Sequence, residues 1–180
     1  GTVTAVTAGS AVITATAKNG RSAACAVTVQ EAGDFVIENG ALTAYKGTEK
    51  NVVIPEGVTA IGDGSAPVFG NQIESVTIPA SVTAIADNAF YSCTGLKSVV
   101  FADGSRLKTI GEGAFYAANQ LQSLSIPEGV TSIGQYAFAA TSKLETIDLP
   151  ASLTEVCGGT WFGNLFARGT NGAPEALTAV

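Results

Sequence analysis

Three segments repeat one pattern: Ile85-Ala-Asp-Asn-Ala-Phe90, Ile110-Gly-Glu-Gly-Ala-Phe115 and Ile133-Gly-Gln-Tyr-Ala-Phe138. A fourth copy, Val156-Cys-Gly-Gly-Thr-Trp-Phe162, is one residue longer. The phenylalanines at positions 90, 115 and 138 are 25 and then 23 residues apart. A period in this range is typical of solenoids, whose repeats cannot bury a core alone and must stack. We therefore expect the phenylalanines to stack as a core spine rather than to form a ligand-binding row, and Trp161 to pack at the end of the stack.

Each repeat also contains an apolar block of the form L-x-x-L-x-L, the strand signature of leucine-rich repeats. Its last two apolar residues are two positions apart, so both point to one face of a strand. A proline ends three of the four copies by removing a ladder donor. The copies are Ile73-Glu-Ser-Val-Thr-Ile-Pro79, Leu96-Lys-Ser-Val-Val-Phe101, Leu121-Gln-Ser-Leu-Ser-Ile-Pro127 and Leu144-Glu-Thr-Ile-Asp-Leu-Pro150.

A second, shorter block precedes each Ala-Phe segment and is expected to be extended. Its copies are Val58-Thr-Ala-Ile61, Val82-Thr-Ala-Ile85, Leu107-Lys-Thr-Ile110, Val130-Thr-Ser-Ile133 and Leu153-Thr-Glu-Val156. The Ala-Phe segment is predicted to form one helical turn, with Asp87 or Glu112 near its start. The predicted fold class is therefore α/β but β-rich: a right-handed leucine-rich-repeat solenoid.

The chain before the repeats has a different composition. Residues 1–30 contain Thr/Val-rich alternating runs at 2–6, 11–17 and 24–29, and the turn signals Gly9-Ser10 and Asn19-Gly20 separate them. This pattern predicts a short antiparallel β segment of three strands. Residues 31–34 are predicted to be a linker, and residues 35–45 a hairpin cap around Asn39-Gly40. Residues 35–180 then form the repeat domain, with about five repeats and an irregular last one in which Leu177–Val180 is a candidate strand.

Composition excludes several classes of protein. The 180 residues are 46% hydrophobic and 13% charged, with a formal net charge of −6. The chain is too apolar for disorder and has no apolar run long enough for a membrane helix. Its acidic balance, without Lys/Arg clusters, argues against binding to nucleic acid and offers no basic anchor for lipid. Because the chain lacks methionine, we expect it to be an internal piece of a longer protein.

The residue types needed for most catalysis are missing or scattered. The sequence has no histidine, which removes His-dependent triads, general bases and metal sites. The three cysteines, Cys25, Cys93 and Cys157, form no CxxC motif. We expect Cys25 to be a buried thiol in a strand, and no disulfide between Cys93 and Cys157, which occupy different points in their repeats.

Acidic residues and glycines give no stronger signal. Glu145 and Asp148 fall on the polar side of a predicted strand, not in the cleft that paired catalytic carboxylates require. Asp63-Gly64 and Asp103-Gly104 lack a dense ladder of calcium ligands and are predicted to be turns. We therefore predict no catalytic residue, no metal site and no cofactor.

Two resemblances to known families follow from these motifs. The segment Ile126-Pro-Glu-Gly-Val-Thr-Ser-Ile-Gly-Gln-Tyr-Ala-Phe138, with its continuation to Pro150, resembles the BspA-like leucine-rich repeat, and the likeness covers residues 34 to about 165. It is interrupted by extra residues within 62–69 and by a two-residue insertion at Asp103-Gly-Ser-Arg106, and it ends after Phe162. Residues 1–17 and 19–29 look like the end of a group 2 bacterial Ig-like domain. The resemblance implies a non-enzymatic adhesion or protein-interaction module, extracellular and on a bacterial cell surface or secreted, whose partner would be a protein or a host extracellular-matrix ligand.

Partner-binding residues are expected between the repeated apolar ones, where the strands present their outward side chains. In-register strands would place these residues in parallel rows on one extended face, of the kind that solenoids use for recognition. The candidate partner face consists of Glu74, Ser75, Thr77, Lys97, Ser98, Val100, Gln122, Ser123, Ser125, Glu145, Thr146 and Asp148. Two alternatives stay open: a structural spacer that presents another domain, and a carbohydrate-binding module.

Overall fold

A computed structural model of the chain describes residues 9–16, 22–29 and 32–156. It divides into two units, Gly1–Asp34 and Phe35–Val180. In the first unit, β1 (Gly9–Thr16) and β2 (Ser22–Val29) pair antiparallel without a bulge. Two of the three predicted strands are thus confirmed, whereas the one at 2–6 and the turn at 19–20 lie outside the described residues. The predicted turn at Gly9-Ser10 is wrong, because both residues belong to β1 and pair with Val29 and Thr28.

A single turn of 3-10 helix, η1 (Ala32–Asp34), occupies the predicted linker. The second unit begins with the predicted hairpin, which is confirmed. Its strands are β3 (Phe35–Glu38) and β4 (Ala41–Tyr45). Asn39 and Gly40 both have positive φ, 52° and 83°, as a two-residue turn between right-twisted strands requires.

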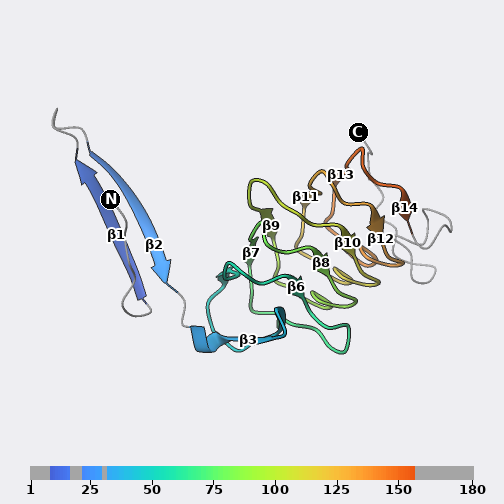
Figure 1. Cartoon of the computed structure of the whole chain (residues 1–180), viewed down its shortest axis with the longest axis horizontal. Helices are drawn as coiled ribbons and strands as arrows, with labels where there is room; N and C mark the ends of the chain where they lie inside the picture. Colours follow the sequence, from blue (N-terminus) through green and yellow to red (C-terminus); the bar gives the residue numbers. More distant parts are fainter. Residues whose placement is uncertain (1–8, 17–21, 30–31, 157–180) are drawn as a thin grey trace. The chain divides into compact units, whose positions relative to one another are not determined.

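The repeats form a β-solenoid with two ladders of parallel strands (Figure 1). One sheet runs without a break from the cap through every repeat, in the order β14-β12-β10-β8-β6-β4-β3. Its repeat strands have two residues each: β6 (Ala60–Ile61), β8 (Ala84–Ile85), β10 (Thr109–Ile110), β12 (Ser132–Ile133) and β14 (Glu155–Val156). These strands confirm that the second apolar block is extended.

The L-x-x-L-x-L blocks form the other ladder, as predicted. This ladder consists of a three-stranded and a two-stranded sheet. The first sheet contains β5 (Asn51–Val53), β7 (Ser75–Ile78) and β9 (Ser98–Phe101), and the second contains β11 (Ser123–Ser125) and β13 (Thr146–Asp148). All of these pairs are parallel, and each inward residue lies opposite its copy in the next repeat.

The Ala-Phe segments are not helical, which corrects the predicted helical turn. Each has one residue in the left-handed region before its phenylalanine and a second one two positions after it, such as Asn88 and Ser92, with φ of 58° at both. Left-handed residues interrupt a right-handed helix and turn amide groups outward. These amides donate to the next repeat instead, as in Phe90 N to Ala114 O at 2.8 Å and Phe115 N to Ala137 O at 2.8 Å. The turns therefore form a third hydrogen-bonded side of the solenoid.

The predicted phenylalanine spine is confirmed. Phe69, Phe90, Phe115 and Phe138 stack nearly parallel, with centroid separations of 4.9, 4.9 and 5.5 Å. Tyr45 of the cap packs on Phe69 at 5.9 Å. Phe90, Phe115 and Phe138 are completely buried, so the aromatic row supplies packing energy and is unavailable to a ligand.

Candidate functional site

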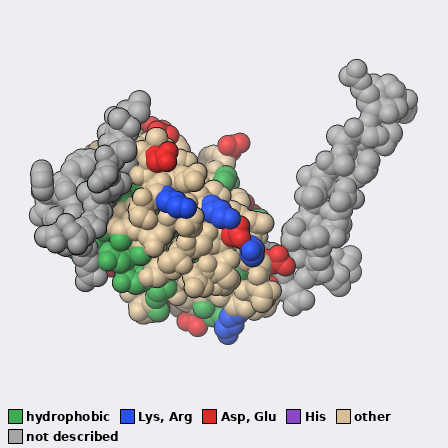
Figure 2. Space-filling model, turned by 180° about the vertical axis from the view of Figure 1, so that it is seen from behind, with side chains coloured by type: hydrophobic (Ala, Val, Ile, Leu, Met, Phe, Trp, Pro, Cys, Tyr) green, Lys and Arg blue, Asp and Glu red, His purple; other side chains and the backbone are tan. Residues whose placement is uncertain are grey.

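The residues predicted to form the partner face lie together on the outer side of the second ladder, which we call the ladder face. Eight lie inside its strands, and Glu74, Lys97, Gln122 and Glu145 each directly precede one of them. None of the twelve is buried. Seen from behind, this side of the solenoid is mostly uncharged, with basic and acidic side chains close together (Figure 2).

Pairing arranges the ladder face in rows. One row runs Asn51, Ser75, Ser98 and the next runs Val53, Thr77, Val100. The Ser75 hydroxyl donates to Asn51 Oδ1 at 2.7 Å, which fixes the start of the first row. Asn51 and Val53 were missed at the sequence level, although Asn51-Val-Val-Ile-Pro55 carries the same strand-then-proline signal as the later repeats.

A charged cluster joins three repeats at one end of the ladder face. The Glu74 carboxylate receives Lys50 Nζ at 2.7 Å and Lys97 Nζ at 2.6 Å on its two oxygens. Hydrogen bonds from both lysines, reinforced by their charges, lower the pKa of Glu74 to about 2. At this end of the ladder face, one carboxylate is therefore matched by two cations.

The ladder face is not continuous, contrary to the prediction of one extended sheet. Within the described part of the chain, no backbone hydrogen bond joins β9 to β11. The two rows of the three-stranded sheet end at β9. Two new rows begin on β11, where Ser123 lies opposite Thr146 and Ser125 lies opposite Asp148. The break follows the connection that carries the Asp103–Arg106 insertion, which has five residues between Phe101 and Leu107 instead of the three between Ile126 and Val130.

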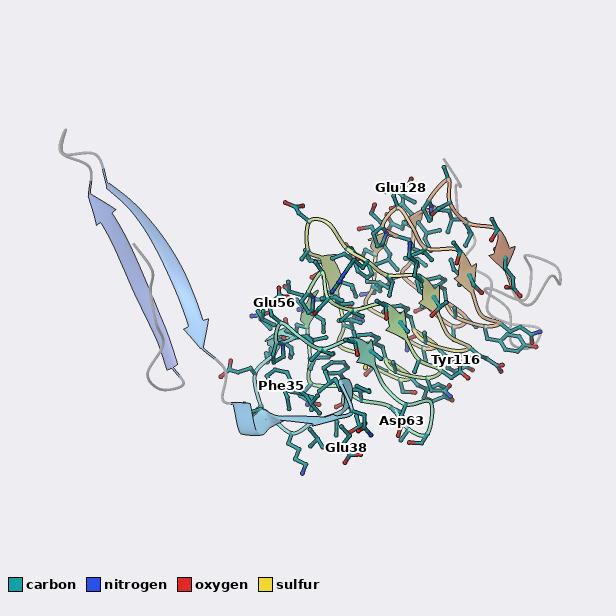
Figure 3. The ribbon with its side chains drawn as sticks, viewed as in Figure 1. Phe35, Glu38, Glu56, Asp63, Tyr116 and Glu128 are labelled. Carbon is teal, nitrogen blue, oxygen red and sulfur yellow. The ribbon has the colours of Figure 1, made fainter. Side chains whose placement is uncertain are left out.

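A groove of about 510 Å³ lies at this break, and we call it the β9–β11 groove. It is lined by Val99, Val100, Phe101, Ala102, Asp103, Gly104, Ser105, Ser125, Pro127 and Glu128. Figure 3 places Glu128 on the opposite side of the solenoid from Asp63 and Tyr116. The groove was not predicted, although the insertion that accompanies it is visible in the sequence.

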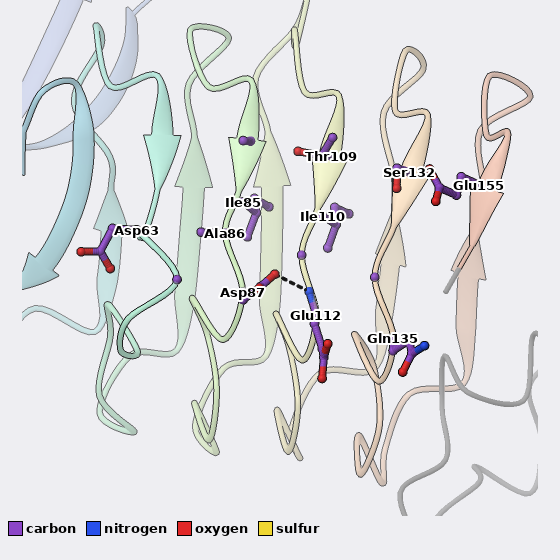
Figure 4. Close-up of a pocket in the computed structure, with 14 residues that line it drawn as sticks. Asp63, Ile85, Ala86, Asp87, Thr109, Ile110, Glu112, Ser132, Gln135 and Glu155 are labelled. Carbon is purple, nitrogen blue, oxygen red and sulfur yellow. Dashed lines mark hydrogen bonds between the residues drawn. The ribbon is translucent and has the colours of Figure 1, made fainter. Parts of the chain in front are cut away.

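A second groove, of about 610 Å³, runs along the continuous sheet (Figure 4). Carboxylates of Asp63, Asp87, Glu112 and Glu155 line it. Asp87 Oδ1 accepts a hydrogen bond of 2.7 Å from the Glu112 amide, so this carboxylate also joins two repeats. Hydrogen bonds from the hydroxyl and amide of Ser65 lower the pKa of Asp63. The signal for this row is visible in the sequence, because three of its acidic residues stand two positions after Ile61, Ile85 and Ile110.

Comparison with known families decides the identity of this fold. The family model of the BspA type leucine rich repeat region matches residues 37–165, in six copies. This chain belongs to that family. The leucine-rich-repeat solenoid predicted from the sequence is thereby confirmed. No curated protein matches the chain.

Two solved structures are similar to this BspA type chain. A leucine-rich repeat protein of T. pallidum superposes with a TM-score of 0.62 at 27% identity, over 71% of this chain and 64% of that one. The pneumococcal vaccine antigen PcpA superposes with a TM-score of 0.53 at 20% identity, over 82% of this chain and 49% of that one. The likeness to PcpA concerns the fold alone. The chain thus spans less than two thirds of the length of either protein.

In this BspA type solenoid, whose sequence has no histidine, cysteines and acidic side chains are the first candidates for a reactive or metal-binding group. Cys93 is fully buried, and its thiol donates to the Phe69 carbonyl at 3.6 Å. Burial raises the pKa of the thiol to about 12, so the reactive thiolate does not form near neutral pH. Asp103-Gly104 is a turn as predicted, whereas Asp63-Gly64 leads into a bend that is closed by hydrogen bonds from Ser65 to Asp63 Oδ1; both glycines have positive φ. Among the residues that the structure describes, no three acidic or cysteine side chains gather as a metal site. The described part of the chain also contains no helix that could cross a membrane.

The structure does not test the predictions made for Cys25, Cys157, Trp161 and the last candidate strand. Cys157 and Trp161 lie outside the described residues, as does the candidate strand Leu177–Val180. Cys25 belongs to β2, but the structure does not describe its side chain.

Proposed function

We propose that this chain is a non-enzymatic protein-binding module of a bacterial cell-surface protein, and that it binds its partner through the ladder face. The observation that carries the proposal is the contrast between the two sides of each ladder strand. Inward residues such as Val76, Leu124 and Ile147 are apolar in every described ladder strand, and these three are buried. Outward residues are polar in most positions and solvent-accessible; the row Val53, Thr77, Val100 changes from repeat to repeat, whereas Ser75, Ser98 and Ser123 are the same. Solenoids use extended, accessible faces of this kind for recognition.

The extracellular location is also a proposal, and family membership supports it. The first unit gives further support, because its sequence resembles the end of a group 2 bacterial Ig-like domain. Its two described strands, β1 and β2, pair in register as a hairpin. Antibodies raised against this chain should then label intact cells of the organism that makes it. Labelling only after the cells are opened would contradict the proposal.

Binding can be tested with an array of purified extracellular-matrix and bacterial surface proteins. Thr146 and Thr109 offer a matched pair, because each is an exposed threonine within a short repeat strand, one on the ladder face and one on the continuous sheet. Thr146→Lys should weaken binding of a captured protein about tenfold, because a long cation would project from the contact surface, while Thr109→Lys should not.

The alternatives predict other outcomes of the same experiment. A spacer would capture no protein above the background of an unrelated solenoid. A carbohydrate-binding module would instead give hits on a glycan array that Thr146→Lys removes. Equal loss of protein binding in Thr146→Lys and Thr109→Lys would show that the ladder face is not the contact surface.

A further inference from the structure

The β9–β11 groove exposes apolar side chains whose equivalents in the repeats of β5, β7 and β11 are buried. The inward residues of β9, Val99 and Phe101, are only partly buried, whereas the equivalent Val76 and Ile78 of β7 are 0% exposed. On the far side of the groove, the equivalent residues of β11 and the following position, Leu124 and Ile126, are 2% and 4% exposed. Among the described repeats, incomplete burial is found on β9 and again at Leu149, after β13; on β9 it accompanies the break in the ladder.

The same edge carries unused backbone groups. A parallel strand normally bonds to a neighbour on each side, and β9 bonds only to β7 within the described residues. A further strand between β9 and β11 would need them about 10 Å apart. Cα atoms of the two strands lie within 8 Å of each other, so a ligand would enter the groove with its side chains rather than as an added strand. The five-residue connection after Phe101 holds this edge open at its C-terminal end. It has a bond of its own from Ser105 N to Ala102 O at 3.1 Å.

Charge restricts the kind of peptide that fits. The groove is bordered by the carboxylates of Asp103 and Glu128, and no Lys or Arg lines it. Both of these side chains are exposed, on opposite sides of the groove. Val100, 53% exposed, stands beside them on the outward row. An apolar floor with two acidic borders is complementary to a segment that alternates apolar and basic side chains.

We propose that the β9–β11 groove binds an extended segment of the partner protein in which a β-branched or aromatic side chain is flanked by Lys or Arg. The apolar side chain enters the groove against Val99 and Phe101, and the segment's cations meet Asp103 and Glu128. This inference rests on the proposed function of the ladder face and names the chemistry of the partner.

The test uses the full chain and a phage-displayed library of random peptides. Selected peptides should be rich in Lys or Arg beside Val, Ile or Phe, and a synthetic copy of the most enriched one then serves as the probe. Val53 provides a matched control for Val100, because the two valines lie in one row and are 54% and 53% exposed. By fluorescence polarisation, Val100→Asp should weaken the probe about tenfold or more, and Val53→Asp less than about twofold.

A second substitution keeps the test independent of folding. Asp103→Lys changes an exposed side chain that forms no hydrogen bond among the described residues, and it should weaken the basic probe several-fold, with binding of a copy in which Glu replaces Lys and Arg becoming stronger. Glu128 is left in place, because its Oε1 accepts a hydrogen bond from Ala151 N of the next repeat at 3.2 Å. The proposal is overturned if the library gives no enriched peptide, or if Val100→Asp leaves the probe's affinity unchanged. Equal losses in Val53→Asp and Val100→Asp would overturn the proposal that the groove binds the segment, but would retain the ladder face as a binding surface. The same conclusion would follow if Thr146→Lys lost binding on the array while no groove variant had an effect.

Discussion

Gly134 lies at a point where two repeats approach each other more closely than a side chain allows. A Cβ added there would lie 2.5 Å from the Glu112 amide nitrogen and 2.6 Å from the Gly111 carbonyl carbon. Both are backbone atoms of the preceding repeat and cannot move away cheaply. Gly111 stands in the same relation to Asp87, one repeat earlier. The spacing of the continuous sheet is therefore fixed by the absence of side chains at these two positions.

We expect Gly134→Ala to lower the free energy of unfolding by about 1–3 kcal/mol, the usual cost of overpacking. Urea denaturation measures it. Gly33→Ala is the control, because a Cβ there meets no atom within 4 Å. If the two substitutions had the same effect, the close approach of the repeats would not be what the glycine provides.

Glu74 gives the solenoid a pH-dependent stability. Its pKa falls from an ordinary value of 4.5 to about 2 in the folded protein. A group with a lowered folded pKa stabilises the protein above its unfolded pKa and loses that contribution as the pH falls through the folded one. Stability should thus decline between about pH 4.5 and pH 2, and Glu74→Gln should remove this part of the decline.

Urea unfolding at several pH values measures the Glu74 contribution. Glu145→Gln is the matched control, because Glu145 precedes its ladder strand as Glu74 does but forms neither of the ion pairs found among the described residues. The effect of Glu74 should be small and should shrink in about 1 M salt, since exposed ion pairs are screened. An equal change of slope in the two variants would contradict the role of the lysines.

At the scale of the elements, the apolar periodicity in the sequence correctly predicted the strands but not the conformation of the turns. Apolar residues two apart located β7, β9, β11 and β13, and Asn39-Gly40 located the cap. The Ala-Phe segments were mistaken for helical turns because residues such as Ala117 and Ala140 adopt φ of 58°, which no local propensity favours. Alternate amides donate to the neighbouring repeat, such as Ala117 N to Ala139 O at 2.9 Å, and others donate within the turn, such as Tyr116 N to Gly113 O at 2.9 Å. The stacking of repeats therefore contributes to their conformation, and the segment alone does not reveal it.

The candidate site was predictable in part for the same reason. Alternation along each strand identified which residues face outward, and all twelve do lie on the accessible side. The insertion at Asp103–Arg106 was also visible in the sequence. Its consequence was not, because whether β9 and β11 pair depends on how a longer connection holds the strands apart in space. The β9–β11 groove is therefore a property of two repeats together.

Shortening that connection should close the break in the ladder. Replacing Ala102-Asp-Gly-Ser-Arg106 by Pro-Glu-Gly, the sequence of residues 127–129, gives the connection the length of its neighbours. We expect β9 to pair with β11 and to cover Val99 and Phe101, adding about 1–3 kcal/mol of stability from buried apolar surface. Hydrogen exchange at the amides of residues 98–101 and 122–125 should slow.

Lengthening the connection after β11 is the control for shortening the connection after β9. Inserting Gly-Ser after Glu128 lengthens the connection that follows β11 and should weaken the pairing of β11 with β13, which joins Leu124 to Ile147. Exchange in residues 123–125 would then accelerate. Unchanged exchange in both variants would show that the length of the connection does not govern pairing.

At the scale of the whole molecule, stability is a sum of contacts between neighbours. The buried apolar side chains of the described repeats begin at Phe35 and continue to Ile147 in a single cluster. Each repeat packs only on the one before and the one after, so a solenoid needs a shield at its ends. The β3–β4 hairpin provides one at the first repeat, where Leu42 pairs with Ile61 and both are completely buried.

Two truncations separate the contribution of the first unit from that of the cap. Removing residues 1–34 leaves every buried side chain of the described repeats in place, so the urea midpoint of the remaining unit should be unchanged. Removing residues 1–45 also deletes Phe35, Leu42 and Tyr45, each worth about 1.5–3 kcal/mol when buried. It also uncovers Ile61 and one face of the Phe69 ring. The second truncation should therefore lower the midpoint strongly or prevent folding, and circular dichroism in urea compares the two. An equal loss in both would mean that the solenoid depends on residues 1–34 for its stability, and that the hairpin alone does not cap it.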